Sequence, residues 1–175
     1  VPHWHRKDGG PYIGSGSLVV MRDPETGWVN ASIYRVQVHA RNRVTIQFDH
    51  MGRHGAIIAR KYWSKGRACP VAVVNGEDPA LFISGFEYLP EGASEYSFAG
   101  GIKQRPVEVC DGPITGLPLP ARAEIILEGM LLPFDDQSLP EGPFGEFTGY
   151  YANYARPAPV MDVTTEETGG YEGTG

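Results

Sequence analysis

The stretch that sets the fold is residues 17–39, SLVVMRDPETGWVNASIYRVQVH. Residues 17–22 form a short apolar run, and residues 28–39 scatter β-branched side chains among polar ones, as a strand does. Between them, residues 23–27 read DPETG, in which proline presets φ and glycine tolerates the left-handed position of a turn. The three segments together predict a β-hairpin.

Three further segments carry helix signals. Residues 55–66 have a helical apolar stripe and end on Gly66, a residue type that commonly follows the last turn of a helix. Asp78 and Pro79 have the order of an N-cap residue and a first-turn proline, so a second helix is predicted to begin there. Residues 94–101 predict a third short helix.

The remaining apolar runs predict strands, and residues 1–16 read as an ordered loop rich in Gly, Pro and His. The predicted fold class is therefore α+β and β-rich, with two or three flanking helices. The strand count suits a small barrel that closes on itself. The further strands are expected at residues 43–49, 70–75, 107–110, 123–132, 149–154 and 160–164.

The composition narrows the class of protein. A chain of 175 residues suits one domain with a substantial core, and a net charge of -6 gives no support for nucleic-acid binding. No apolar run reaches the roughly 20 residues needed to cross a bilayer. Two cysteines are too few for a disulfide framework, so we expect a reducing cytoplasm. We expect a domain at residues 1–165, a flexible tail at 166–175, and a longer parent polypeptide, since the chain begins at Val1.

Two carboxylates, Glu141 and Glu146, flank the segment Gly-Pro-Phe-Gly, and an aromatic run follows at residues 147–151. Two acids held close on a rigid turn resist joint ionisation, which is one way to keep a proton available near neutral pH. The glycine and proline serve turn geometry equally well, so this segment needs support from the rest of the chain.

Polar residues at the centre of the second predicted strand form a second candidate site. Because side chains alternate along a strand, Asn30, Ser32 and Tyr34 share one face and Arg35 points to the other. Three polar groups on one face suit a phosphate or metal site, or simply a solvated strand face. Arg35 stands in mid-strand among apolar neighbours, where an arginine usually needs a carboxylate partner.

His50, Arg53 and His54 lie just before the first predicted helix. The start of a helix offers unpaired N–H groups and a positive dipole end, which suit a phosphate, and Arg53 adds a fork-shaped donor. The alternative is a histidine that only caps the helix. Glu95 lies at the start of the third predicted helix, and on its own it reads as a surface residue that stabilises the helix dipole.

Four blocks carry a family pattern: NASIYRVQ at residues 30–37, GRHGA at 52–56, PEGASEYSFAG at 90–100 and PEGPFGEFTGYY at 140–151. In this order they resemble the UbiD family of decarboxylases, which use prenylated FMN. The match covers nearly the whole chain, and the fourth block is the most specific. The resemblance implies a split β-barrel related to flavin-reductase domains.

The resemblance also implies binding residues. Asn30, His54 and Glu95 match the family's ligands for a divalent metal, usually manganese, and a set of oxygen and nitrogen donors suits Mn²⁺ or Mg²⁺. A potassium ion often lies nearby in the family. The positions implied to contact the cofactor are Ser32, Ile33, Tyr34, Arg35, Gln47, Phe48, Asp49, Arg53, His54 and Gly55.

Arg35, Glu141 and Glu146 match the family's Glu-Arg-Glu network. The implied activity is a reversible, non-oxidative decarboxylation of an aromatic or α,β-unsaturated acid. Arg35 orients the substrate carboxylate, Glu146 delivers the proton that replaces CO₂, and Glu141 holds both. The cofactor holds the charge that departing CO₂ leaves behind. An FMN prenyltransferase is the implied source of the cofactor.

Family members also carry an N-terminal portion and a C-terminal domain, and neither is present in this chain. The C-terminal domain mediates oligomer formation in the family, so the implied parent protein is a homo-oligomer. Two alternatives to an enzyme remain: a flavin-binding split-barrel module, and an inactive fragment without a complete active site.

Overall fold

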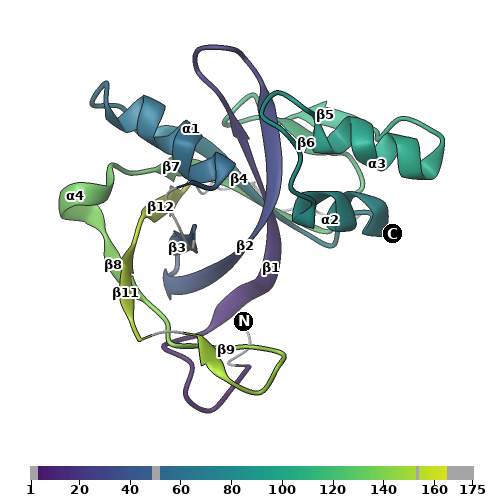
Figure 1. The fold of residues 1–175 in the computed structure, drawn as a ribbon. Coiled ribbons are helices and arrows are strands. Elements are labelled where there is room, and N and C mark those ends of the chain that lie inside the picture. Colours follow the sequence, from purple (N-terminus) through teal and green to yellow (C-terminus); the bar gives the residue numbers. More distant parts are fainter. Residues whose placement is uncertain (1–3, 49–51, 153, 165–175) are drawn as a thin grey trace, which may run out of the picture.

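The computed structural model of the protein describes residues 4–48, 52–152 and 154–164, and six strands in this part of the chain close into an antiparallel barrel (Figure 1). Their order around the barrel is β1-β2-β3-β12-β7-β4. The predicted barrel and the β-rich class are confirmed. The strands are β1 (Tyr12–Arg22), β2 (Val29–Ala40), β3 (Arg43–Gln47), β4 (Cys69–Asn75), β7 (Ile125–Leu131) and β12 (Val160–Val163).

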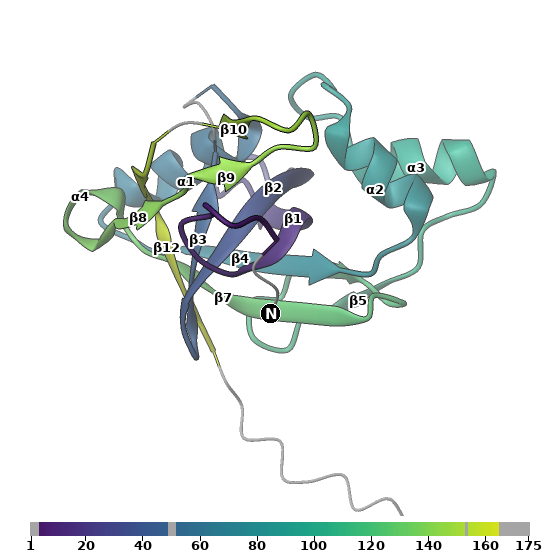
Figure 2. The same cartoon turned by 90° about the horizontal axis from the view of Figure 1, so that it is seen from below.

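Helices and short two-stranded ribbons surround the barrel. Helix α1 lies against the barrel strands, whereas α2 and α3 lie together on another side, next to the β5–β6 ribbon (Figures 1 and 2). The helices are α1 (His54–Trp63), α2 (Pro79–Phe86), α3 (Glu95–Lys103) and the single-turn α4 (Phe134–Gln137). The ribbons pair β5 (Val109–Asp111) with β6 (Pro118–Pro120), β8 (Leu139–Glu141) with β11 (Arg156–Ala158), and β9 (Phe144–Gly145) with β10 (Tyr151–Ala152).

Strand β1 is buried on both faces, which explains its unbroken apolar run. Val19 and Met21 point into the barrel and join a cluster to which all six barrel strands and α1 contribute. Leu18 and Val20 point outward into a second cluster, which Leu81 of α2 helps to close. Alternate side chains of one strand therefore fill two different cores, and a sequence with two buried faces loses the polar alternation of a half-exposed strand.

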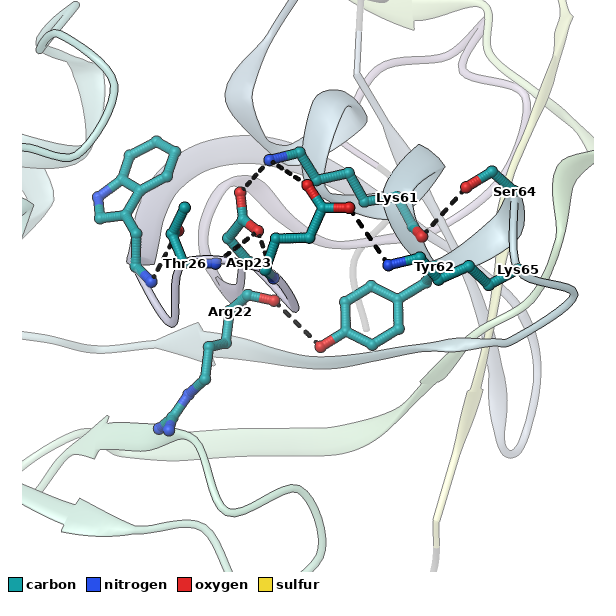
Figure 3. Close-up of polar contacts among 9 residues, drawn as sticks. Arg22, Asp23, Thr26, Lys61, Tyr62, Ser64 and Lys65 are labelled. Atoms are coloured by element: carbon teal, nitrogen blue, oxygen red, sulfur yellow. Dashed lines mark hydrogen bonds and ion pairs between the residues drawn. The ribbon is translucent and has the colours of Figure 1, made fainter.

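The turn between β1 and β2, residues 23–27, is fixed to α1 by polar contacts (Figure 3). Asp23 accepts two N–H hydrogen bonds within the turn and pairs with Lys61 of α1 at 2.5 Å. Burial acts to raise the pKa of Asp23, but hydrogen bonds from Lys61 and the turn outweigh it and hold the pKa below its usual range. The Tyr62 hydroxyl of α1 donates to the Arg22 carbonyl at the end of β1, so α1 is attached to this end of the β1–β2 hairpin by two separate polar contacts.

Local signals located the helix starts well. Asp78 caps α2 by accepting from the Ala80 N–H, and Ser94 caps α3 by accepting from the Ser97 N–H. The first helix ends at Trp63, before the predicted boundary, and Gly66 takes its positive φ in the turn that follows.

Several predicted boundaries were wrong. The first strand starts at Tyr12, inside the segment predicted as a loop, and register shifts between Tyr12 and Ser17 interrupt its alternation. The predicted strand at residues 149–154 corresponds to the two-residue strand β10, because its partner strand, β9, also has only two residues. Strands β6, β8, β9 and β11 were not predicted, because runs of two or three residues carry no periodic signal.

Other expectations concern the chain as a whole. Both Cys69 and Cys110 are free thiols, as expected. None of the helices in the described ranges is long and apolar enough to cross a membrane. The predicted tail at residues 166–175 lies outside the described residues.

Candidate functional site

Strand β2 carries one polar set on each of its faces. Asn30, Ser32 and Tyr34 lie on one face, as predicted: Asn30 donates to Ser32 at 3.0 Å, and the Tyr34 hydroxyl accepts the Gly55 N–H of α1 at 3.2 Å. All three side chains are buried, so the alternative of a solvated strand face is wrong. A buried row of amide and hydroxyl groups is held by mutual hydrogen bonds.

Glu95 is 1% exposed, and its interpretation as a surface residue is therefore wrong. Its carboxylate accepts from Asn30 Nδ2 at 2.8 Å and from the Ala31 N–H at 3.1 Å. Burial raises the pKa of Glu95, because desolvation disfavours the charged form. Among the described residues, no cationic side chain forms an ion pair with it. A buried acid without a counter-charge fits a bound cation.

His54 is the first residue of α1, and its ring lies between two aromatic rings. The Trp28 ring is 5.0 Å away edge-on, and the Tyr88 ring is stacked at 5.9 Å. The helix has no side-chain cap, so the alternative of a capping histidine is wrong. Trp28 Nε1 donates to the Ala93 carbonyl at 2.8 Å, which ties His54 to the loop that leads into Glu95. Burial lowers the pKa of His54 and favours the neutral imidazole, the form that binds metals.

Asn30, His54 and Glu95 are therefore gathered around the start of β2. The contacts join Asn30 to Glu95 directly and His54 to the same loop through Trp28. Across the described ranges, no group of three or more His, Cys, Asp and Glu side chains is placed to hold a metal. The predicted set has only two residues of those types, because its third member, Asn30, is an amide. An amide, an imidazole and an uncompensated carboxylate fit a hard divalent cation.

The described positions among those implied to contact the cofactor lie where β2, the end of β3 and the start of α1 come together. Arg53 Nη2 donates to the Ile33 carbonyl at 3.3 Å, and its guanidinium lies 5.1 Å from the centre of the Tyr34 ring. Phe48 contacts the same ring edge-on at 5.1 Å. Tyr34 and Phe48 are buried in the barrel core, so they pack against this region from the interior of the barrel. Asp49 and His50 lie outside the described residues.

Two structural features of this region fit a phosphate. The first turn of α1 contains no acidic residue, so the positive end of its dipole is not neutralised. A side chain at Gly55 would overlap the Tyr34 hydroxyl and the Phe48 ring, so the backbone of the first turn lies close to β2. Backbone N–H groups at a helix start, with Arg53 beside them, are a common anion-binding arrangement.

Arg35 lies on the other face of β2, opposite Gln47 of β3, and it bridges the two predicted acids. Arg35 and Glu141 form a bidentate ion pair, in which Arg35 Nε donates to Glu141 Oε1 and Arg35 Nη2 donates to Glu141 Oε2, both at 2.8 Å. Nη1 faces Glu146 Oε1 at 3.9 Å. Glu141 is 1% exposed, whereas the Glu146 side chain is 38% exposed. The expected carboxylate partner of Arg35 is thus present, and a bidentate pair of this kind is strong and directional.

Further residues around the turn at 141–146 were not predicted from the sequence. The Tyr12 hydroxyl donates to Glu141 Oε1 at 2.7 Å, and Gln37 Oε1 accepts the Gly142 N–H at 2.9 Å. Asp8 Oδ1 accepts the Gly145 N–H at 2.8 Å. Both Asp8 and Tyr12 lie in the segment at residues 1–16 that was predicted to be a loop. Sequence reasoning could not find these residues, because their hydrogen-bond partners lie far away along the chain and become neighbours only in the folded protein.

Comparison with known proteins identifies the pattern. The family model of the UbiD carboxy-lyase Rift-related domain, described as 3-octaprenyl-4-hydroxybenzoate carboxy-lyase, matches residues 1–165. The pyrrole-2-carboxylic acid decarboxylase of Pseudomonas aeruginosa strain PAO1 is 36% identical over 167 residues, which are 93% of this chain and 32% of that protein.

Solved structures show the same likeness. The UbiD-class enzyme HmfF from Pelotomaculum thermopropionicum, in an evolved dimeric form with prFMN, has a TM-score of 0.86 at 34% identity, covering 94% of this chain and 37% of that one. The vanillic acid decarboxylase of Sedimentibacter hydroxybenzoicus in closed form has a TM-score of 0.83 at 31% identity, covering 91% and 34%.

The chain spans about a third of the length of the curated relatives that it matches. Within that third, the barrel, the four sequence blocks and the family match coincide. The chain belongs to the UbiD family.

Proposed function

We propose that this chain is the cofactor-binding domain of an enzyme that reversibly decarboxylates an aromatic or α,β-unsaturated carboxylic acid with prenylated FMN. One observation carries the proposal: Arg35 is gripped by the buried Glu141 and turns a third nitrogen toward Glu146. A domain that only binds a flavin has no need of two acids around one arginine.

The binding residues follow from the contacts around β2. The start of α1 with Arg53 would hold the cofactor phosphate, and Asn30, His54 and Glu95 would hold Mn²⁺ or Mg²⁺ beside it. The buried charge of Glu95 supports a cation at this place, and K⁺ is a further candidate nearby. The other proposed contacts with the cofactor are Ser32, Ile33, Tyr34, Arg35, Gln47, Phe48, Asp49 and Gly55.

When bound, prenylated FMN supplies the electron sink that accepts the charge left by departing CO₂. Arg35 binds the substrate carboxylate through the side that faces Glu146 and so aligns the bond that breaks. The carbon–carbon bond to the carboxylate breaks, its electron pair stays on the organic fragment, and a proton from Glu146 takes the place of CO₂. In the carboxylation direction Glu146 removes that proton.

The two acids have different exposures, which assigns them different roles. Glu146 is partly open to solvent, so it can exchange its proton between turnovers. Glu141 is buried and held by Arg35 and Tyr12, so it fixes the guanidinium in place. The carboxylate that is free to move is thus the proton carrier.

The remaining two thirds of the length seen in relatives would close the pocket and form the homo-oligomer. HmfF, solved as an evolved dimeric form with prFMN, supports both an oligomeric parent protein and this cofactor. An FMN prenyltransferase would supply the prenylated flavin. The named substrates of relatives, pyrrole-2-carboxylic acid and vanillic acid, are the first acids to test.

The test uses the full-length enzyme loaded with prenylated FMN and measures CO₂ release from these acids. We expect kcat of the Glu146→Gln variant to fall about 100-fold or more, which is the usual contribution of a positioned proton donor to the rate. The variant should keep its cofactor absorbance. Glu108→Gln is the matched control, since Glu108 lies in an exposed ion pair with Arg122. Unchanged turnover in Glu146→Gln would remove this residue from the chemistry. A wild-type enzyme that binds the cofactor but converts no acid would favour the flavin-binding module.

A further inference from the structure

The segment before β1 wraps the turn that carries both acids. Figures 1 and 2 show residues 4–11, at the purple end of the ribbon, running beside β9. The Gly9 N–H donates to the Pro143 carbonyl at 2.8 Å, and Asp8 Oδ1 accepts the Gly145 N–H at 2.8 Å. A side chain at Gly145 would overlap the His5 ring, so the two segments are in direct contact.

Tyr12 completes this contact at the other end of the turn. It is 0% exposed, and its ring meets the Phe144 ring at 4.9 Å. Its hydroxyl lies 2.7 Å from Glu141 Oε1 and 3.1 Å from Gln37 Oε1, so its single proton goes to the nearer carboxylate. Burial, together with the hydrogen bond to Glu141, raises the pKa of Tyr12, so it stays a donor at all working pH values.

Tyr12 and Asp8 thereby hold different parts of the proposed site. Glu141 Oε1 receives both the Tyr12 hydroxyl and Arg35 Nε, so Tyr12 acts on the arginine through Glu141. Asp8 anchors the N–H of the residue directly before Glu146, while its other oxygen accepts the His5 N–H at 2.8 Å. Among the described residues, the one ion pair of the Glu146 side chain is the 3.9 Å approach to Arg35, so its position depends on the backbone of the turn. Asp8 holds that backbone at Gly145, and the Glu146 N–H donates to the Tyr150 carbonyl within the turn.

We propose that Asp8 and Tyr12 are positioning residues. They hold the Glu146 carboxyl and the Arg35 guanidinium in the relative positions that proton transfer to the substrate requires. This inference rests on the proposed function. A proton donor misplaced by about 1 Å can cost 100-fold in rate. The segment around Asp8 therefore belongs to the reaction machinery, although neither residue touches the substrate.

The first test separates the two residues by steady-state kinetics of the full-length, cofactor-loaded enzyme. We expect Asp8→Ala to lower kcat about tenfold or more with little change in KM, because it frees Glu146 but leaves Arg35 gripped. Asp8→Asn keeps an oxygen acceptor for the Gly145 N–H and should recover most of kcat. Tyr12→Phe should lower kcat and also raise KM, because it loosens Glu141 and with it the arginine that binds the substrate.

Matched controls come from the opposite end of the barrel. Asp23→Ala removes another buried carboxylate that accepts turn N–H groups, and Tyr62→Phe removes another hydroxyl that donates across the fold. We expect both controls to lower stability and to leave kcat and KM unchanged. If they reduce kcat as much as Asp8→Ala and Tyr12→Phe do, the effect is general loss of stability and the positioning role is refuted.

The second test does not depend on turnover. Amide hydrogen exchange should be slow at Gly145 in the wild type and faster in Asp8→Ala, whereas Val73 in the barrel should keep its protection. Unchanged exchange at Gly145 would overturn the proposal at its structural basis. Faster exchange with unchanged kcat would overturn the positioning role alone. An inactive wild type with a protected Gly145 would overturn the proposed function, and the positioning role with it, while leaving the Asp8 hydrogen bond established.

Discussion

Arg35 is the residue on which the proposed site depends, because the distant segment at residues 141–146 contacts its guanidinium through Glu141, Phe144 and Glu146. It is 9% exposed, and its main partner, Glu141, lies 106 positions away. The Phe144 ring lies 5.2 Å from the guanidinium and covers it. Each buried charge is therefore tolerable only while the other is present.

This dependence predicts an asymmetric response to substitution. Arg35→Met should lower the free energy of unfolding by about 3 kcal/mol, because it leaves the Glu141 charge buried without its cation. The double variant Arg35→Met/Glu141→Gln should recover a large part of that loss. Urea unfolding of the three proteins measures both values, and a double variant no more stable than Arg35→Met would contradict this account.

Glu95 leads to a prediction about metal. Because its buried carboxylate has no cationic partner in the described ranges, Mn²⁺ should stabilise the protein, by about 2.7 kcal/mol at 100 times its Kd. Thermal unfolding with and without Mn²⁺ measures the gain, and EDTA should reverse it. We expect Glu95→Gln to fold and to lose the gain.

Glu128→Gln is the matched control for this experiment, since Glu128 is also a buried carboxylate but lies by the β5–β6 ribbon, where it accepts from the Thr115 N–H. It should keep the full response to Mn²⁺. An equal response in Glu95→Gln would remove Glu95 from the ligand set.

At the scale of elements, α1 links the site to the rest of the barrel. Its start faces the proposed phosphate position, and Lys61 near its end is fixed to the β1–β2 turn. The close approach of its first turn to β2 depends on Gly55, where a Cβ would lie 2.9 Å from both the Tyr34 hydroxyl and the Phe48 ring.

Two glycine-to-alanine changes in helices should therefore have opposite effects. Gly101→Ala in α3 meets open space and should stabilise by about 0.5–1 kcal/mol, the usual gain in helix propensity. Gly55→Ala should destabilise by about 1–3 kcal/mol, since buried rings must move to admit the methyl group. Chemical denaturation of both variants tests the pair, and a stabilised Gly55→Ala would show that α1 does not lie this close to β2.

At the scale of the whole molecule, the barrel has two cores that share β1, β2 and β4. Cys69 begins β4 and is fully buried in the inner core, whereas Cys110 in the β5–β6 ribbon is exposed. Burial raises the pKa of the Cys69 thiol far above its usual value, so two factors protect it from thiol reagents.

Cys69 should therefore report global unfolding. In a Cys110→Ser background, labelling of Cys69 should be slow and should accelerate with urea as steeply as global unfolding does, because a closed barrel has no edge at which β4 can open alone. In a Cys69→Ser background, Cys110 should label within seconds. Fast labelling of Cys69 without denaturant would show that the barrel opens locally.

The features that sequence reasoning located well are those with local causes. Three such features are the DPETG turn, the Asp78 cap and the start of the third helix near residue 94. The alternation of Asn30, Ser32 and Tyr34 against Arg35 is a fourth, and all of them follow from backbone geometry within a few residues. Boundaries were lost where the pattern is interrupted, as in the irregular start of β1, or where a strand has only two or three residues.

The amino-acid sequence was enough to predict the hairpin, the β-rich class and the family, and to name the residues that are proposed to act in the reaction. The surroundings of these residues emerge only in the three-dimensional fold. Glu95 is buried and forms no ion pair among the described residues, Glu141 rather than Glu146 is enclosed, and Tyr12 and Asp8 contact the acidic turn. The physical reason is separation along the chain. Tyr12 meets Glu141 across 129 positions and Asp8 meets Gly145 across 137, and such contacts exist only once the barrel closes.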